Sequence, residues 1–196
     1  MPAEINFAAD GRVLVVSEKG TQTIDTYRVD FRGYASQPIS NRSSGMTPFG
    51  FSVTNRDYVI VSEADIPGAA SSYEISYETD QIADLKLVSG SVALGQSAPC
   101  WLVTTHDGRY AYTANAGSGT ISSLGIAPDG VLSLLNPVAA SLAAPLDLAM
   151  TGNSKFLYVR EGTGAVTGFQ VAPDGRLTLI GSWPGIPAGA QGIAAR

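Results

Sequence analysis

One unit of turns and short apolar runs recurs four times along the chain. Its turn residues are 45, 52 and 46 residues apart, at Asp10, Asn55, Asp107 and Asn153. An upstream proline repeats with the same rhythm, at Pro2, Pro48, Pro99 and Pro145. Because two independent markers share one period, the sequence predicts a chain built from a single repeated structural unit.

Each copy begins with the proline and continues with a short apolar strand, a tight turn, a second strand, a loop and a third strand. In the last two copies a Pro-Asp-Gly turn and a fourth strand follow. Four antiparallel strands in about 45 residues are typical of a propeller blade. We therefore predict an all-β fold, a β-propeller of about four four-stranded blades that forms one unit over residues 1–196. The repeats cover approximately 2–46, 47–97, 98–143 and 144–185, and 186–196 is predicted to be the innermost strand of a further blade.

Two other all-β architectures fit the repeat less well. A two-sheet sandwich does not need the same turn chemistry at one fixed period, and a β-helix repeats at about half this length or less. A single four-stranded blade buries too little surface to be stable alone, so blades must stack. Four blades cut from a larger ring would leave two apolar faces uncovered, which predicts self-association through the open blade faces.

Charge and composition argue against two classes of partner. The chain of 196 residues has a net charge of -5, and its 12 Lys and Arg residues are scattered singly, which does not favour binding to nucleic acid. It contains no run of eighteen apolar residues and no basic start followed by an apolar stretch, so we expect no membrane span and no signal peptide in this chain. Cys100 is the only cysteine and excludes an internal disulfide. The compartment stays open.

Polar residues occupy the loop between the second and third strands of every repeat. They are Glu18, Glu63, Asn115 and Glu161. In a propeller this loop opens on one mouth of the central channel, where the four side chains would form a ring, with Lys19 and Arg160 as the only loop cations beside them. Such a ring suits a hard cation or a polyhydroxylated ligand, or it supplies an acid or base. The alternative is that these residues only cap tight loops in water. We expect no cofactor, and the sequence does not decide whether a metal binds.

Three further residues are candidates by chemistry alone. Asp147 is a carboxylate in an otherwise apolar inner strand, where it faces either a ligand in the channel or a backbone donor that holds blades in register. His106 is the only histidine and lies in a turn, which argues against a catalytic triad or a histidine metal site. Cys100, beside Trp101, is expected to be a packed apolar residue because no histidine is available to activate it.

Several stretches resemble a known family, the lactonase-type seven-bladed propellers. They are "DGRVLVVSEKG", "DGRYAYTANAGSGTIS" and "SKFLYVREGTGAVTGFQVAPDGRLT". This family includes bacterial 6-phosphogluconolactonases and fungal carboxy-cis,cis-muconate lactonizing enzymes. The resemblance implies that the chain corresponds to the last four blades and that the parent protein opens or closes a lactone. The context of Glu63, "VIVSEA", is similar to the family pattern "YVVNEL", which implies that Glu63 is the acid or base.

Basic residues of the family pattern are missing here. Its "PRH" motif is Pro48-Phe49-Gly50, the arginine of its "SNRG" motif is Ala116, and a later "PR" is Pro145-Leu146. Without this positive charge we expect no 6-phosphogluconolactonase activity, and a neutral lactone, a sugar or a cation remains open. Two hypotheses follow. The first is a lactonase-like enzyme in which Glu63 acts on a small-molecule substrate. The second is a non-catalytic propeller that binds a ligand or assembles.

Overall fold

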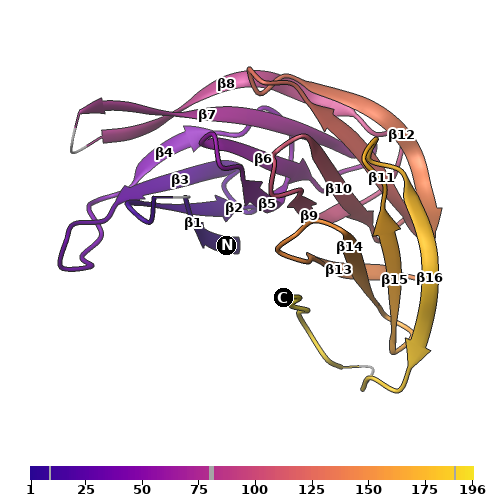
Figure 1. Cartoon of the computed structure of the whole chain (residues 1–196). Helices are drawn as coiled ribbons and strands as arrows, with labels where there is room; N and C mark the ends of the chain where they lie inside the picture. The colour runs from indigo at the N-terminus through magenta and orange to yellow at the C-terminus, as the bar shows by residue number, and fades with distance from the viewer. Residues whose placement is uncertain (9, 80–81, 188) are drawn as a thin grey trace.

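The computed structural model describes residues 1–8, 10–79, 82–187 and 189–196. Within those ranges it contains sixteen β-strands and no helix, and so none that is long and apolar enough to cross a membrane. The strands form four four-stranded antiparallel sheets, each made of four consecutive strands (Figure 1). This confirms the all-β propeller architecture with four blades that the repeat predicts.

Each blade follows the chain from its inner to its outer strand. Blade 1 contains β1 (Pro2–Phe7), β2 (Val13–Glu18), β3 (Thr23–Arg28) and β4 (Ile39–Arg42). Blade 2 contains β5 (Pro48–Val53), β6 (Tyr58–Glu63), β7 (Ala69–Thr79) and β8 (Ile82–Ala93). Blade 3 contains β9 (Pro99–Thr104), β10 (Tyr110–Asn115), β11 (Thr120–Ile126) and β12 (Leu132–Ser141). Blade 4 contains β13 (Pro145–Met150), β14 (Phe156–Glu161), β15 (Ala165–Val171) and β16 (Leu177–Pro184).

The four blades form an arc around the inner strands. Strand β1 contacts β5, β5 contacts β9, and β9 contacts β13, so the first strands of successive blades lie next to one another. Figure 1 shows the arc open between blade 1 and blade 4, with both ends of the chain on its concave side. The chain therefore presents two end faces, one on blade 1 and one on blade 4, that have no neighbouring blade.

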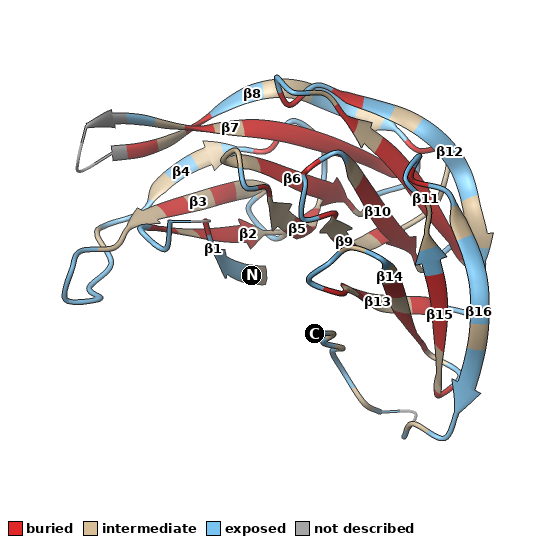
Figure 2. Ribbon diagram, in the orientation of Figure 1, coloured by how far each residue is buried: buried red, intermediate tan, exposed pale blue. Residues whose placement is uncertain are grey.

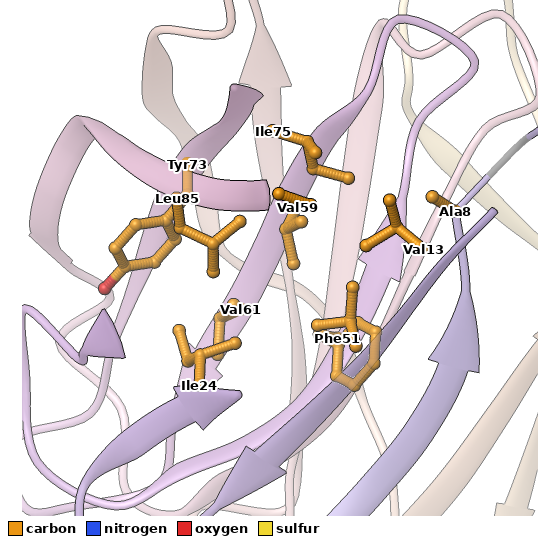
Figure 3. Close-up of a cluster of buried hydrophobic side chains, with 11 residues drawn as sticks. Ala8, Val13, Ile24, Phe51, Val59, Val61, Tyr73, Ile75 and Leu85 are labelled. Atoms are coloured by element: carbon orange, nitrogen blue, oxygen red, sulfur yellow. The ribbon is translucent and has the colours of Figure 1, made fainter. Parts of the chain in front are cut away.

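The apolar core lies between the blades. Successive strand residues point to opposite faces of a sheet, so each blade contributes one set of side chains to the blade before it and another to the blade after it. Figure 3 shows this between the first two blades, where Val13 and Ile24 face Val59, Val61 and Tyr73. Equivalent clusters lie between blades 2 and 3 and between blades 3 and 4. The stacking that the repeat requires is thus the main source of apolar burial.

The Pro-Asp-Gly turns of blades 3 and 4 pack against the preceding blade. Gly130 and Gly175 have φ values of +82° and +80°, a conformation that glycine adopts at little cost. A Cβ on Gly130 would lie 2.5 Å from the ring of Tyr58, and one on Gly175 would lie 2.7 Å from the ring of Tyr110. Two independent constraints therefore require glycine at this position. The turn needs a positive φ, and the aromatic ring of the neighbouring blade leaves no room for a side chain.

The C-terminal tail, 185–196, runs from the outer strand β16 back towards the inner strands (Figure 1). The amides of Gly185 and Ile186 donate to the carbonyl oxygen of Gly164, at 3.1 and 3.0 Å. Further along, the amide of Ile193 donates to Asp147 Oδ2 at 3.1 Å. The described part of the tail has no assigned strand, and residue 188 lies outside the described residues. Its role as the inner strand of a further blade stays a prediction.

Candidate functional site

The four polar residues of the predicted ring hold one equivalent position. Each is the last residue of its blade's second strand, where it pairs with the proline that opens the same blade. Figure 2 shows the second strands β6 and β10 buried over most of their length. The strand-end position is therefore set by the sheet register, and its surroundings decide whether the side chain reaches a ligand.

Glu63 is buried against the connection that enters its own blade. Only 2% of the residue is exposed. Its Oε1 accepts hydrogen bonds from the amide of Gly45, at 2.8 Å, and from the hydroxyl of Ser71 on β7. A Cβ on Gly45 would lie 2.0 Å from Oε2, so the connection has no room for a side chain there. The carboxylate holds the chain just before Pro48 against the sheet.

Glu161 repeats this arrangement in blade 4. It is 5% exposed. Its Oε2 accepts a hydrogen bond from the amide of Ala143 at 2.9 Å, and its Oε1 accepts one from the hydroxyl of Thr167 on β15. Ala143 stands just before Pro145, as Gly45 stands just before Pro48. Two blades thus use one device, in which a buried carboxylate bridges the incoming connection and a hydroxyl on the third strand.

Asn115 and Glu18 are variants of the same device. The amide of Asn115, fully buried, donates to the hydroxyls of Thr120 and Ser122 at 3.0 and 2.8 Å. Glu18 is partly exposed, and its Oε2 accepts a hydrogen bond from the amino terminus of Met1 at 2.8 Å. Three of the four predicted ring residues are therefore enclosed by protein in this structure. This geometry favours structural caps over a ring open to ligands.

The two predicted loop cations have different surroundings. Lys19 Nζ lies 4.7 Å from the centre of the Phe49 ring, and Phe49 meets Trp101 edge to face with the ring centres 5.3 Å apart. Arg160 is the penultimate residue of β14 and is only 1% exposed. Its cross-strand neighbour is Asp147 on β13.

Asp147 and Glu4 occupy the same place in two inner strands, two residues after the proline that opens the blade. Glu4 Oε2 accepts a hydrogen bond from the amide of Phe51 on the next inner strand at 2.6 Å. Asp147 Oδ2 likewise accepts a hydrogen bond from the amide of Ile193 in the tail. Each carboxyl group therefore connects one inner strand to the segment that follows it around the arc. The intervening blades have Gly50 and Trp101 at this place.

The pKa values of both carboxyl groups are raised. Burial raises the pKa of Glu4 to about 7, although its hydrogen bond from Phe51 favours the ionised form; the charge of Asp147 raises the pKa further. Burial also raises the pKa of Asp147, against its hydrogen bonds from Leu148 and Ile193 and the nearby charge of Arg160. A carboxyl group with a pKa near neutrality is suited to exchange protons with a substrate.

Glu4 was not among the residues singled out from the sequence. Its place in the repeat, two residues after the opening proline, is shared with Asp147, and this equivalence was the available signal. What the sequence does not show is that this residue is partly buried, with its carboxyl group against β5, which raises its pKa.

His106 is exposed in the turn after β9, as expected, and borders a cleft of about 400 Å³ formed by the turns that follow β5, β9 and β13. Cys100 is half-buried, and burial raises the pKa of its thiol, which disfavours the reactive thiolate. Among the described residues, no three His, Cys, Asp or Glu side chains gather closely enough to hold a metal ion.

Comparison with protein-family models gave no match, and comparison with curated proteins gave none either. Solved structures do match. A functionally unknown protein from Desulfotomaculum acetoxidans has a TM-score of 0.75 and 16% identity, over 92% of this chain and 55% of that one. A candidate 6-phosphogluconolactonase from Bacteroides uniformis has a TM-score of 0.73 and 19% identity, over 95% of this chain and 58% of its own.

The periplasmic gluconolactonase of Pseudomonas aeruginosa has a TM-score of 0.71 and 21% identity, over 97% of this chain and 59% of its own. The chain thus shares its fold of four-stranded antiparallel blades with these solved structures. This chain spans little more than half the length of these structures. At this level of identity the comparison establishes the fold, and chemistry has to be argued from the residues.

Proposed function

We propose that the chain is part of a lactonase-like hydrolase that opens an uncharged lactone, with Glu4 and Asp147 as its acid–base pair. The observation that carries this proposal is the pKa of about 7 at Glu4, on an inner strand and within electrostatic reach of a second carboxyl group. General acid–base catalysis is most effective when the pKa of the catalytic group lies near the operating pH.

The chemistry needs only water and the two carboxyl groups. Ionised Asp147 takes a proton from water while the water oxygen bonds to the lactone carbonyl carbon. The bond between that carbon and the ring oxygen then breaks, and Glu4, which its pKa of about 7 keeps largely protonated below neutral pH, donates a proton to the ring oxygen. Exchange of protons with water returns both carboxyl groups to their starting states. The product is the open-chain hydroxy acid. An uncharged lactone is favoured because the basic residues that would bind a phosphate are missing at Phe49, Gly50, Ala116 and Leu146.

The test is hydrolysis of gluconolactone and of its 6-phosphorylated counterpart by the purified chain, measured in a pH-stat against the spontaneous rate. We expect turnover of the uncharged lactone, above the spontaneous rate, that falls as the pH rises through about 7, where Glu4 loses its proton, and a loss of about 100-fold in Glu4→Gln. Asp147→Asn should also lose turnover, with circular dichroism unchanged in both variants. A wild-type rate equal to the spontaneous rate would refute the proposal.

Glu63 is tested in the same assay. If it is the acid or base, as the family resemblance implies, Glu63→Gln should lose turnover and keep its stability. The hydrogen bonds to Gly45 and Ser71 favour the opposite result, lower stability with little direct effect on the chemistry.

A second candidate function is a catalytically silent propeller that serves in assembly. The burial of Glu63, Asn115 and Glu161 favours this function, because their polar atoms then hold the backbone of the protein and are closed to a ligand. Absence of turnover with either lactone, together with a defined oligomer, would support it.

A further inference from the structure

The end face of blade 1 exposes a position that is buried in every other blade. This position lies three residues after the opening proline and holds Ile5, Phe51, Leu102 and Leu148. The last three are 1%, 3% and 4% exposed and pack in the clusters between blades, whereas Ile5 is 63% exposed. Phe7, on the same strand, is 50% exposed. Blade 1 therefore carries the receiving half of a blade interface without its partner.

The end face of blade 4 carries the other half. In each blade, one residue of the third strand pairs with the penultimate residue of the second strand. In blades 1 to 3 this residue is completely buried against the next blade, and it is Ile24, Ala70 and Ile121. In blade 4 this position is Val166, which is only partly buried. Its neighbour on β16, Trp183, is 51% exposed. Figure 2 shows β1 and β16 exposed over much of their length.

We propose that two copies of this chain close into one ring, with blade 1 of each copy docked on blade 4 of the other. The contact between the copies would repeat the contact between successive blades within one copy. Blade 4 presents the face that meets a following blade, and blade 1 presents the face that meets a preceding blade. One copy cannot join its own ends, since its arc is open (Figure 1). A second copy covers both faces at once and gives eight blades, within the range of four to eight that propellers use.

The tail must move for the ring to close. The amide of Ile193 binds Asp147 as the amide of Phe51, on the following inner strand, binds Glu4. The tail therefore lies where strand β1 of the second copy would lie. Dimer formation displaces the tail from Asp147, so the tail competes with the second copy for this site.

The first experiment is light scattering after size exclusion over a range of concentrations. We expect a mass that rises from 20.3 kDa to twice that value and then stays constant. A monomer at every concentration would overturn the proposal. So would a mass that keeps growing, because a head-to-tail contact that does not close produces open chains of subunits.

Single substitutions on the two faces test which surfaces meet. Ile5→Asp on blade 1 and Trp183→Asp on blade 4 should each weaken the dimer by about 10-fold or more, because each buries a charge in an apolar contact. A mixture of the two variants should dimerise better than either alone, since one of the two contacts in a mixed ring is intact. An effect of only one variant would indicate that like faces meet and would refute the ring.

Phe31→Asp is the matched control, because Phe31 is 92% exposed in the β3–β4 loop. It should leave dimerisation unchanged. Circular dichroism and thermal unfolding of each variant show whether the monomer is still folded.

The competing tail gives a second, independent test. A chain that ends at Pro184, and the variant Ile193→Pro, which removes the amide that binds Asp147, should both dimerise about fivefold more tightly. Ile193→Pro keeps the tail and covers the case in which the shortened chain does not fold. Weaker dimerisation in Ile193→Pro would show that the tail supports the contact and would refute the competition.

Discussion

The stability of the chain should fall with pH because of Glu4. Its pKa rises from 4.5 to about 7 in the folded chain, since burial disfavours the ionised form. A group whose pKa is raised on folding contributes stability that is fully present below the unfolded pKa and is lost as pH rises through the folded pKa. The loss is about 1.4 kcal/mol for each pH unit between these values, about 3 kcal/mol in all.

The assay is urea unfolding of the wild-type chain and of Glu4→Gln at a series of pH values, at a concentration that keeps both monomeric. Below pH 4.5 the wild-type group is protonated in both states, and the two proteins should respond to pH alike. From there to about pH 7 the wild-type chain should lose about 3 kcal/mol relative to the variant, and above pH 7 the difference should be constant.

Taking the difference between the two proteins removes the titration of the other groups, apart from the coupling to Asp147. The matched control is Glu74→Gln, the same chemical change on β7 at a side chain that is 46% exposed. That variant should differ from the wild-type chain by less than about 1 kcal/mol, because the ion pair that it removes, with Lys86, is exposed to water. A difference between wild type and Glu4→Gln that is flat, or that grows in favour of the wild type as pH rises, would show that Glu4 is not buried as described.

Three further predictions concern the packing between and within the blades. Gly130→Ala should lower the stability in thermal unfolding more than Gly11→Ala does. Both substitutions place an alanine at a positive φ, which costs about 1 kcal/mol, but only the new Cβ at position 130 would lie 2.5 Å from the ring of a neighbouring blade. Equal losses would contradict this. Phe51→Ala should lower the free energy of unfolding of the monomer, measured in urea, by about 3 to 5 kcal/mol. Ile5→Ala, at the same place in the repeat, should lower it by less than about 1 kcal/mol. Similar values would mean that Ile5 is covered within one copy. Ser71→Ala should cost about 1 to 3 kcal/mol, because it removes a donor from a buried carboxylate, and an unchanged urea midpoint would refute the capping role of the strand-end carboxylate.

The repeat was sufficient to predict the blades because each local signal agrees with the global arrangement. Prolines open the inner strands, and the Pro-Asp-Gly turns precede the outer strands of blades 3 and 4. The same period also placed Glu18, Glu63, Asn115 and Glu161 in one equivalent position. These features follow from local sequence and a fixed register.

The surroundings of those residues could not be predicted in the same way. Glu63 is buried because the chain around Gly45 folds back over it, and this contact joins residues 18 positions apart in the sequence. Arg160 was expected in a loop beside the channel mouth, and it is buried at the end of a strand, next to Asp147. Periodicity gives the position of a side chain along a strand, and the burial of its charge depends on segments outside the period.

The four repeats themselves indicate where chemistry is to be sought. The strand-end position is nearly the same in all blades, with three glutamates and one asparagine, and in each blade it makes hydrogen bonds that hold a connection or a neighbouring strand. A position with one structural task in every blade is constrained by that task. The position two residues after the proline has no common task and holds Glu4, Gly50, Trp101 and Asp147. Because the blades differ at this position and two of them place carboxyl groups with raised pKa values there, the inner strands are the better place to look for a reaction.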